Sequence, residues 1–131
     1  MASKEFSIHF TLAEAQAKLH QIMPRLLELQ ELKQDLDRRG YDVYKHQYFG
    51  GMGPNGQKVF PWQMEHLVEI INELTQQGVV IKDLNSVLID FPHLRKNDEE
   101  VLLCFRLGES ELTAWHTLEG GFAGRQPLDA L

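Results

Sequence analysis

The spacing of hydrophobic residues in the first part of the chain predicts a long helix. From Thr11 to Gly40, apolar residues recur at alternating steps of three and four, which is the period of one helical face. They are Leu12, Ala15, Leu19, Ile22, Leu26, Leu29 and Leu36, with Lys33 at the one polar position of this coiled-coil-like seam. Thr11 and Glu14 have the spacing of a capping box, and Gly40 is a typical C-terminal stop. We therefore expect the helix to fill this interval.

A second helix is predicted after Pro61, because proline suits the first helical turn. Its apolar residues again step by three and four, at Met64, Leu67, Ile71 and Leu74, and Gly78 ends it. Residues 11–77 therefore predict an antiparallel helical hairpin. The connection, residues 41–59, contains glycines and tyrosines without a sustained period, and we interpret it as a long loop. It is either a mobile insertion or a segment that packs or binds.

The period changes in residues 78–128, where short runs of Val, Ile, Leu and Phe are separated by turn-forming residues. The predicted strands are residues 79–83, 87–91, 101–107 and 112–116. Strands with connections this short pair antiparallel, which gives a β-meander of three or four strands. The predicted fold class is α+β, with a helical hairpin followed by a small antiparallel sheet in a single domain, residues 1–131.

Alternation along these strands separates an apolar face from a mixed one, because successive side chains point to opposite sides of a sheet. The apolar set, which we expect to form the core, is Val87, Ile89, Phe91, Val101, Leu103, Phe105 and Leu107. The opposite set is half apolar and half ionic: Val80, Lys82, Leu88, Asp90, Leu102, Cys104 and Arg106. Charges are seldom placed on a half-apolar face unless something neutralises them. The mixed face is therefore the place for a site.

Several stretches of this part of the chain form one pattern: GVVIKDL, LIDFP, LLCFRLGE, WH and GFAGRQPL. The pattern resembles the domain of unknown function family 2203, a group of small bacterial proteins. The resemblance is specific over residues 78–128 and looser over the opening helix with its FTLAEA start. The sequence departs from the family at Val87, where members usually have Gly, and at Phe105, where they usually have Trp. The family has no established activity, so the resemblance implies no mechanism.

Composition excludes several classes of partner. The net charge of −6 argues against nucleic acid and anionic membranes, because both are bound by basic surfaces. The single cysteine excludes an internal disulfide framework. The longest unbroken apolar run, Val101 to Phe105, is too short to cross a bilayer, and the N-terminus has no signal-like segment. We therefore expect a cytoplasmic location.

The mixed face supplies five candidate ligand-binding residues: Asp90, Arg106, Glu109, His116 and Arg125. The two arginines can present guanidinium forks to a carboxylate or a phosphate, with a histidine titrating nearby. Such a pocket would take a small anionic ligand. The alternative is structural, with Asp90 paired to Lys82 or to Arg106 across neighbouring strands.

Residue types that bind metal ions occur in the same region: Asp90, His93, Cys104, Glu109 and His116. The sequence has no HExxH, CxxC or HxH motif, so we predict no bound metal and no cofactor. Cys104 is then a small buried hydrophobic residue. A nucleophilic pair of Cys104 and His116 for acyl transfer would need the two side chains to meet in the fold.

Two functions of different class follow from these patterns. The helical seam is the strongest periodic signal, and Met23, Leu27 and Leu32 widen it beyond what one partner helix covers. This predicts a homo-oligomer, most simply a dimer, and a non-catalytic, self-associating interaction protein. The alternative is a ligand- or metal-dependent enzyme, or a small anionic-ligand binder, built on the mixed face of the sheet.

Overall fold

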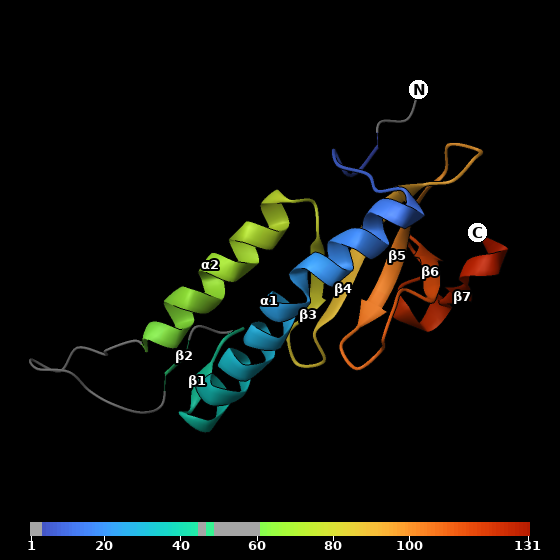
Figure 1. The fold of residues 1–131 in the computed structure, drawn as a ribbon. Coiled ribbons are helices and arrows are strands. Elements are labelled where there is room, and N and C mark those ends of the chain that lie inside the picture. The colour runs from blue at the N-terminus through green and yellow to red at the C-terminus, as the bar shows by residue number, and fades with distance from the viewer. Residues whose placement is uncertain (1–3, 45–46, 49–60) are drawn as a thin grey trace, which may run out of the picture.

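The computed structural model describes residues 4–44, 47–48 and 61–131, and it has a layer of helices packed against an antiparallel sheet (Figure 1). The helices are α1 (Leu12–Arg38) and α2 (Trp62–Gln76). The sheet contains β3 (Val80–Asp83), β4 (Leu88–Leu94), β5 (Glu100–Arg106), β6 (Ala114–Thr117) and β7 (Gln126–Pro127). Short 3₁₀ helices, η2 (Phe122–Gly124) and η3 (Leu128–Ala130), lie near the C-terminus. The predicted α+β class is confirmed.

Helix α1 begins at the predicted capping box. The Thr11 hydroxyl accepts from the backbone N–H of Glu14 at 3.1 Å, and the Glu14 carboxylate accepts from the backbone N–H of Thr11 at 2.8 Å. Gly40 follows the helix with a φ of +77°, which glycine adopts without a steric cost. The buried residues of α1 are Ala15, Leu19, Ile22, Leu26, Leu29, Leu32, Lys33 and Leu36. The predicted seam is therefore the buried face, although Leu12 is only partly buried.

Helix α2 runs antiparallel to α1 and lies on the side of α1 nearest β3, whereas α1 itself crosses the face of the sheet (Figure 1). The buried residues of α2 are Gln63, Met64, Leu67, Ile70 and Leu74. The predicted hairpin is confirmed, with Ile70 taking the buried place that the spacing had given to Ile71. Neither helix is long and apolar enough to cross a membrane.

The sheet is a meander in which each strand pairs antiparallel with the next, in the order β3-β4-β5-β6-β7. Five strands form it, so the predicted count of three or four is wrong. The additional strand, β7, has two residues, which pair with Ala114 and Trp115 of β6. A strand of two residues has no hydrophobic alternation, so the sequence pattern did not show it.

The register confirms the predicted core face. Ile89 lies opposite Phe105, and Phe91 lies opposite Leu103, which is itself opposite Trp115 on β6. All of these side chains are buried in the core with the helical seam. The mixed set therefore occupies the outer face of the sheet, away from the helices.

The start of the predicted loop has regular structure. Tyr41–Asp42 (β1) pairs antiparallel with Gln47–Tyr48 (β2), and both Tyr41 and Val43 are buried in the core. The prediction of an irregular loop is therefore wrong at this end. Its remaining positions, residues 45–46 and 49–60, lie outside the described residues.

Val87, just before β4, has a φ of +49° and is completely buried. A β-branched residue in this left-handed region is strained, because its Cβ approaches the backbone. Glycine is free of this strain, which explains why a residue of that type suits the position. The departure at Val87 noted from the sequence thus falls at a turn that requires an unusual backbone conformation.

Candidate functional site

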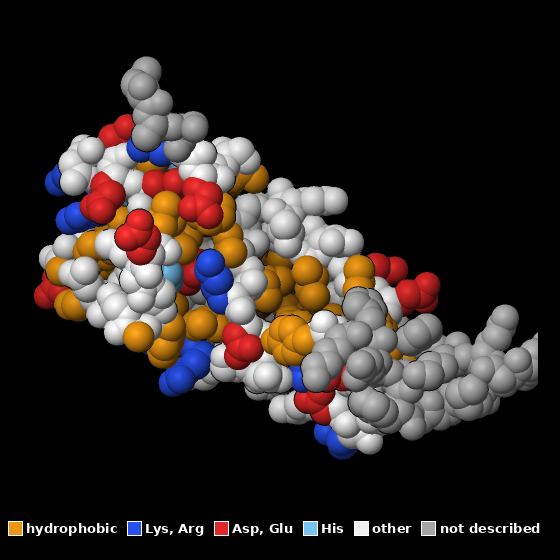
Figure 2. Space-filling model, turned by 180° about the vertical axis from the view of Figure 1, so that it is seen from behind, with side chains coloured by type: hydrophobic (Ala, Val, Ile, Leu, Met, Phe, Trp, Pro, Cys, Tyr) orange, Lys and Arg blue, Asp and Glu red, His pale blue; other side chains and the backbone are white. Residues whose placement is uncertain are grey.

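Three side chains with metal-binding atoms meet on the outer face of the sheet: Asp90 of β4, Cys104 of β5 and His116 of β6. Their ligand atoms lie within 4.8 Å of one another. The exposed fractions of the three residues are 1%, 0% and 3%. Figure 2 shows this face of the molecule, where a histidine and several charged side chains lie among apolar ones. We call these three residues the triad.

The strand register explains why the triad forms. Asp90 and Cys104 are directly opposite each other, and His116 lies opposite Leu102, one place along the same face from Cys104. Asp90 and His116 are on strands that do not touch, and they reach each other over the small side chain of Cys104. A larger residue at this central position would keep the carboxylate and the imidazole apart.

Hydrogen bonds fix the orientation of the imidazole. Nδ1 of His116 lies 2.7 Å from the carbonyl oxygen of Thr117, and a carbonyl only accepts, so Nδ1 carries a proton and donates it. The other ring nitrogen, Nε2, faces the carboxylate of Asp90 at 3.3 Å from each oxygen. The ring therefore presents Nε2 to the centre of the triad.

Burial controls the protonation of the other two residues. It raises the pKa of the Asp90 carboxyl, and the neighbouring His116 and Lys82 oppose this only in part. Burial, together with the charge of Asp90, raises the pKa of the Cys104 thiol to about 12. Without a bound cation, Cys104 is a thiol at neutral pH, which does not suit the nucleophilic pair considered from the sequence.

A second group of side chains forms the rim of the triad. Arg125 makes an ion pair with Glu109, with its Nη2 atom 2.9 Å from Oε2. The same nitrogen lies 3.5 Å from the carbonyl oxygen of Cys104. The guanidinium groups of Arg125 and Arg106 lie 4.7 and 5.4 Å from the ring centroid of Phe122. The rim is thus built from the turn after β5 and from the C-terminal segment.

A family model, described as uncharacterized conserved protein (DUF2203), matches residues 9–128. The chain belongs to this family. No curated protein and no solved structure matches it. The DUF2203 match confirms the resemblance noted from the sequence and extends it over both helices and the sheet. It assigns no chemistry, so the function of this DUF2203 chain must be argued from its own side chains.

The candidate residues from the sequence are brought together in a different pairing from the one predicted. Asp90 contacts His116, whereas Arg106 lies opposite Leu88, is exposed, and packs on Phe122. Of the two cross-strand partners considered for Asp90, Arg106 makes no ion pair with it among the described residues, whereas the charge of Lys82 partly offsets the rise in the pKa of the Asp90 carboxyl that burial causes. Asp90 and Arg106 share a face but lie two residues apart in the register, and the guanidinium of Arg106 lies over the Phe122 ring instead.

Two further residues named from the sequence lie on opposite faces of the sheet. Cys104 is buried, as predicted, and its thiol lies at the centre of the triad. His93 belongs to the other face, where its Nδ1 atom lies 2.7 Å from the carbonyl oxygen of Phe10. Strand alternation predicts that Asp90 and Cys104 share one face of the sheet. Only the register between the strands shows that His116 lies beside them.

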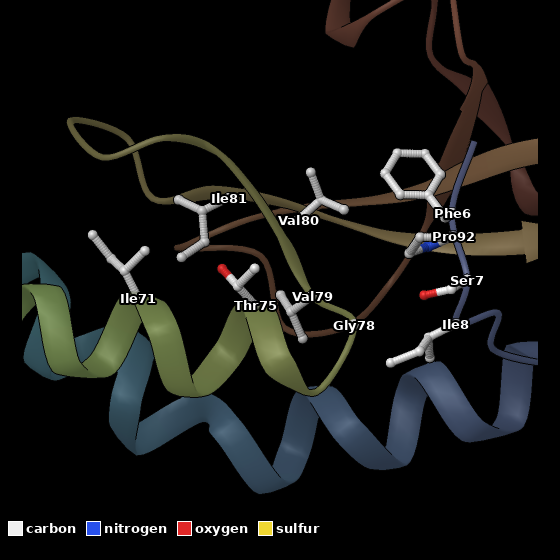
Figure 3. Close-up of a pocket in the computed structure, with 10 residues that line it drawn as sticks. All are labelled: Phe6, Ser7, Ile8, Ile71, Thr75, Gly78, Val79, Val80, Ile81 and Pro92. Carbon is white, nitrogen blue, oxygen red and sulfur yellow. The ribbon is translucent and has the colours of Figure 1, made fainter.

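A separate apolar groove of about 390 Å³ lies between the N-terminal segment, the end of α2 and β3 (Figure 3). Its lining residues are Phe6, Ser7, Ile8, Ile71, Thr75, Gly78, Val79, Val80, Ile81 and Pro92. Gly78, with a φ of +94°, is required here because a Cβ atom would lie 2.6 Å from Cγ2 of Ile8. The described residues that line the groove include no titratable side chain.

Proposed function

We propose, in place of the metal-free chain expected from the absence of motifs, that this chain binds one divalent transition-metal ion, zinc being the best fit, through Asp90, Cys104 and His116. The observation that carries this proposal is the separation of 3.3 Å between Nε2 of His116 and both carboxylate oxygens of Asp90. Zinc bonds to nitrogen and oxygen are about 2.0–2.1 Å long, so two ligands at a tetrahedral angle lie about 3.3–3.4 Å apart. The pair has the spacing of metal ligands.

The same separation is long for an ionic hydrogen bond. Charge-assisted N–H···O contacts are typically about 2.7–2.9 Å. A carboxylate that is 1% exposed has lost its water, and the long contacts from the imidazole, the Cys104 thiol and the charge of Lys82 offset this only in part. A cation between the side chains would supply the missing interaction. The charges of one carboxylate and one thiolate also balance those of a divalent ion.

The chemistry of the donor set selects the metal. A thiolate and an imidazole are ligands that zinc and other late first-row metals prefer, whereas magnesium and calcium prefer oxygen ligands only. The carbonyl of Thr117, which holds Nδ1 of His116, is the kind of outer partner that orients histidine ligands. Three protein ligands leave one tetrahedral position for a small molecule, as in catalytic zinc sites.

The test is metal content. The full chain, loaded with excess zinc sulfate and dialysed, should retain about one zinc per chain by elemental analysis. Cys104→Ser and His116→Asn should lose it, whereas His20→Asn, on the exposed side of α1, should not. The same preparations loaded with cobalt should show a thiolate-to-metal absorption band that Cys104→Ser lacks. A folded wild-type chain with no more zinc than the triad variants would refute the proposal.

We also propose self-association through the outer face of α1, as expected from the extra apolar residues Met23, Leu27 and Leu32 beside the seam. The supporting observation is Leu27, which is 48% exposed, whereas Leu32 is buried. Light scattering at micromolar concentrations should give a dimer, and Leu27→Glu should give a monomer. Ile8→Glu, which changes another exposed apolar residue, should have no effect. A wild-type monomer at every concentration would end this proposal. A cytoplasmic location, proposed from the same sequence, fits the free thiol of Cys104.

A further inference from the structure

The guanidinium of Arg125 contains a buried donor that has no partner among the described residues. Its Nε atom is shielded from solvent and makes no hydrogen bond with the described residues. Nη2 of the same group is fully engaged, because it contacts both carboxylate oxygens of Glu109 at 3.1 and 2.9 Å. A buried N–H of a charged group that lacks an acceptor is costly. The arrangement therefore suits an acceptor that comes from outside the chain.

The register places this donor beside the triad. Ala114 pairs with Pro127 and Trp115 pairs with Gln126, so Arg125 comes just before β7, at the end of that strand nearest His116. The charge of Arg125 also acts on the Cys104 thiol of the outer face. Ala114, which lies opposite Cys104, is small enough for the arginine to extend over β6. This explains the contact of 3.5 Å between Arg125 and the carbonyl oxygen of Cys104.

The arginine is also held in place before any ligand arrives. Glu109 fixes one end of the guanidinium, and the ring of Phe122 packs against its plane. Glu109 is itself fixed, because its Oε1 accepts from the backbone N–H of Arg106 at 2.7 Å. The side chains of Arg125 and Glu109 remain 20% and 23% exposed, so the rim is where a small molecule reaches the site.

We infer that the open metal position takes a small oxyanion, a carboxylate or a phosphate, with one oxygen on the metal and a second accepting from Nε of Arg125. This inference rests on the proposed metal site. Charge supports it, because a divalent ion neutralised by Asp90 and Cys104 leaves the nearby Arg125 and Lys82 in excess over Glu109. Oxyanions carry two or more oxygens on one atom, which allows both contacts at once. The predicted small anionic ligand thus gains a defined place.

The experiment uses the cobalt-loaded full chain, because its absorption spectrum reports ligands at the open position. Sodium acetate and sodium phosphate are titrated separately, and the better-binding anion identifies the carboxylate or the phosphate class. Arg125→Lys keeps the positive charge but loses the Nε–H donor. It should bind one cobalt per chain as the wild type does, and its anion affinity should fall about tenfold or more. Glu109→Gln, which loosens the arginine, should weaken anion binding by a smaller factor.

Arg106→Lys is the matched control, because Arg106 packs on the same Phe122 ring from an exposed position. Its anion affinity should stay within about twofold of the wild type. Anion-induced spectral changes that are equal in the wild type and in Arg125→Lys would overturn the inference, as would the absence of any change in the wild type. Both outcomes leave the metal site intact. Failure to bind cobalt at all would instead refute the metal site and the inference together.

Discussion

Two polar clusters in this chain differ in how completely their buried charged groups are hydrogen-bonded. Nζ of Lys33, a residue that is 6% exposed, lies 2.7 Å from both carboxylate oxygens of Asp37 and 2.8 Å from Oδ1 of Asn85. The carboxylate of Asp90, which is 1% exposed, has contacts of 3.3 Å to His116. An ammonium group has three donors, and Lys33 uses them fully. Asp90 lacks contacts of this quality.

The difference separates a structural cluster from a site. Lys33 occupies the one polar position of the helical seam, and its partners join α1 to the turn between β3 and β4. Nothing further is needed to stabilise that charge. The triad holds a desolvated carboxylate, a thiol and an imidazole nitrogen around a common centre, and this arrangement becomes favourable when a cation binds there.

The largest expected effect is that of zinc on stability. At a free concentration about a thousand times its dissociation constant, zinc should raise the free energy of unfolding by about 4 kcal/mol, because it binds only the folded triad. Denaturant unfolding with zinc and with EDTA measures the difference. Asp90→Asn should unfold with the same free energy in both solutions. An equal gain in that variant would place the zinc elsewhere.

Replacement of Lys33 should have the next largest effect. Lys33→Ala removes a packed aliphatic stem, at a cost of about 2 kcal/mol. Asn85 is exposed, so water replaces the donor that its Oδ1 atom loses. Asp37 is 52% exposed and can be solvated, which limits the loss. The loss should be the same with zinc and with EDTA, in contrast to the triad variants. A loss that appears only with zinc would mean that the two clusters are coupled.

A surface pair of the same chemical type as Asp90 and His116 gives a smaller effect. The hydrogen bond with Glu28 raises the pKa of His66, and that with His66 lowers the pKa of Glu28. The histidine contribution is complete below its usual pKa of 6.5 and is lost as the pH rises through the raised value. The glutamate contribution is complete above its usual pKa of 4.5 and is lost as the pH falls through the lowered value.

The pair should therefore stabilise the fold most between pH 4.5 and 6.5. The gain should be under about 1 kcal/mol, because both side chains are about one-third exposed and screened by solvent. Glu28→Gln, compared with the wild type by denaturation across this range, measures it. Glu5→Gln, an exposed change near the N-terminus, is the control. A difference that grows above pH 7 would contradict the assigned direction.

The smallest effect concerns Asp90 and Arg106, one of the two cross-strand pairs considered from the sequence, whose members have other partners in the described structure. Arg106→Met should cost less than about 0.5 kcal/mol, because the side chain is exposed. In EDTA, its effect should add to that of Asp90→Asn within about 0.5 kcal/mol. Thermal melts of the two single variants and the double variant measure this sum. A strong non-additive loss would restore the original pairing.

Much of the fold could be predicted because each element has a periodic signal of its own. Thr11 and Glu14 mark the start of α1, and the apolar steps mark its buried face. The alternation of Ile89 and Phe91 gives the core face of the sheet. β7 could not be predicted, because two residues cannot show a period. Its pairing depends on the path of the C-terminal segment after η2.

The site was harder to predict, because its members are assembled by register and not by local spacing. Asp90 and His116 are 26 residues apart in the sequence. Their contact depends on three strands lying in one alignment, with a small residue, Cys104, at the centre. A motif search finds ligands that one helix or one turn brings together. It has no access to ligands on neighbouring strands of a sheet.

The backbone conformation of Val87, just before β4, helps to set the alignment of the strands. Its left-handed backbone costs about 1–2 kcal/mol, and burying its side chain offsets this by about 1.5–3 kcal/mol. The preceding turn is closed by Asp83, whose Oδ2 accepts from the backbone N–H and the hydroxyl of Ser86 at 3.0 and 2.6 Å. These hydrogen bonds hold the shape of the turn, although the left-handed backbone conformation is unfavourable for Val87. Asp90 follows three residues later. The balance between backbone strain and side-chain burial at Val87 therefore helps to fix where the Asp90 carboxylate lies.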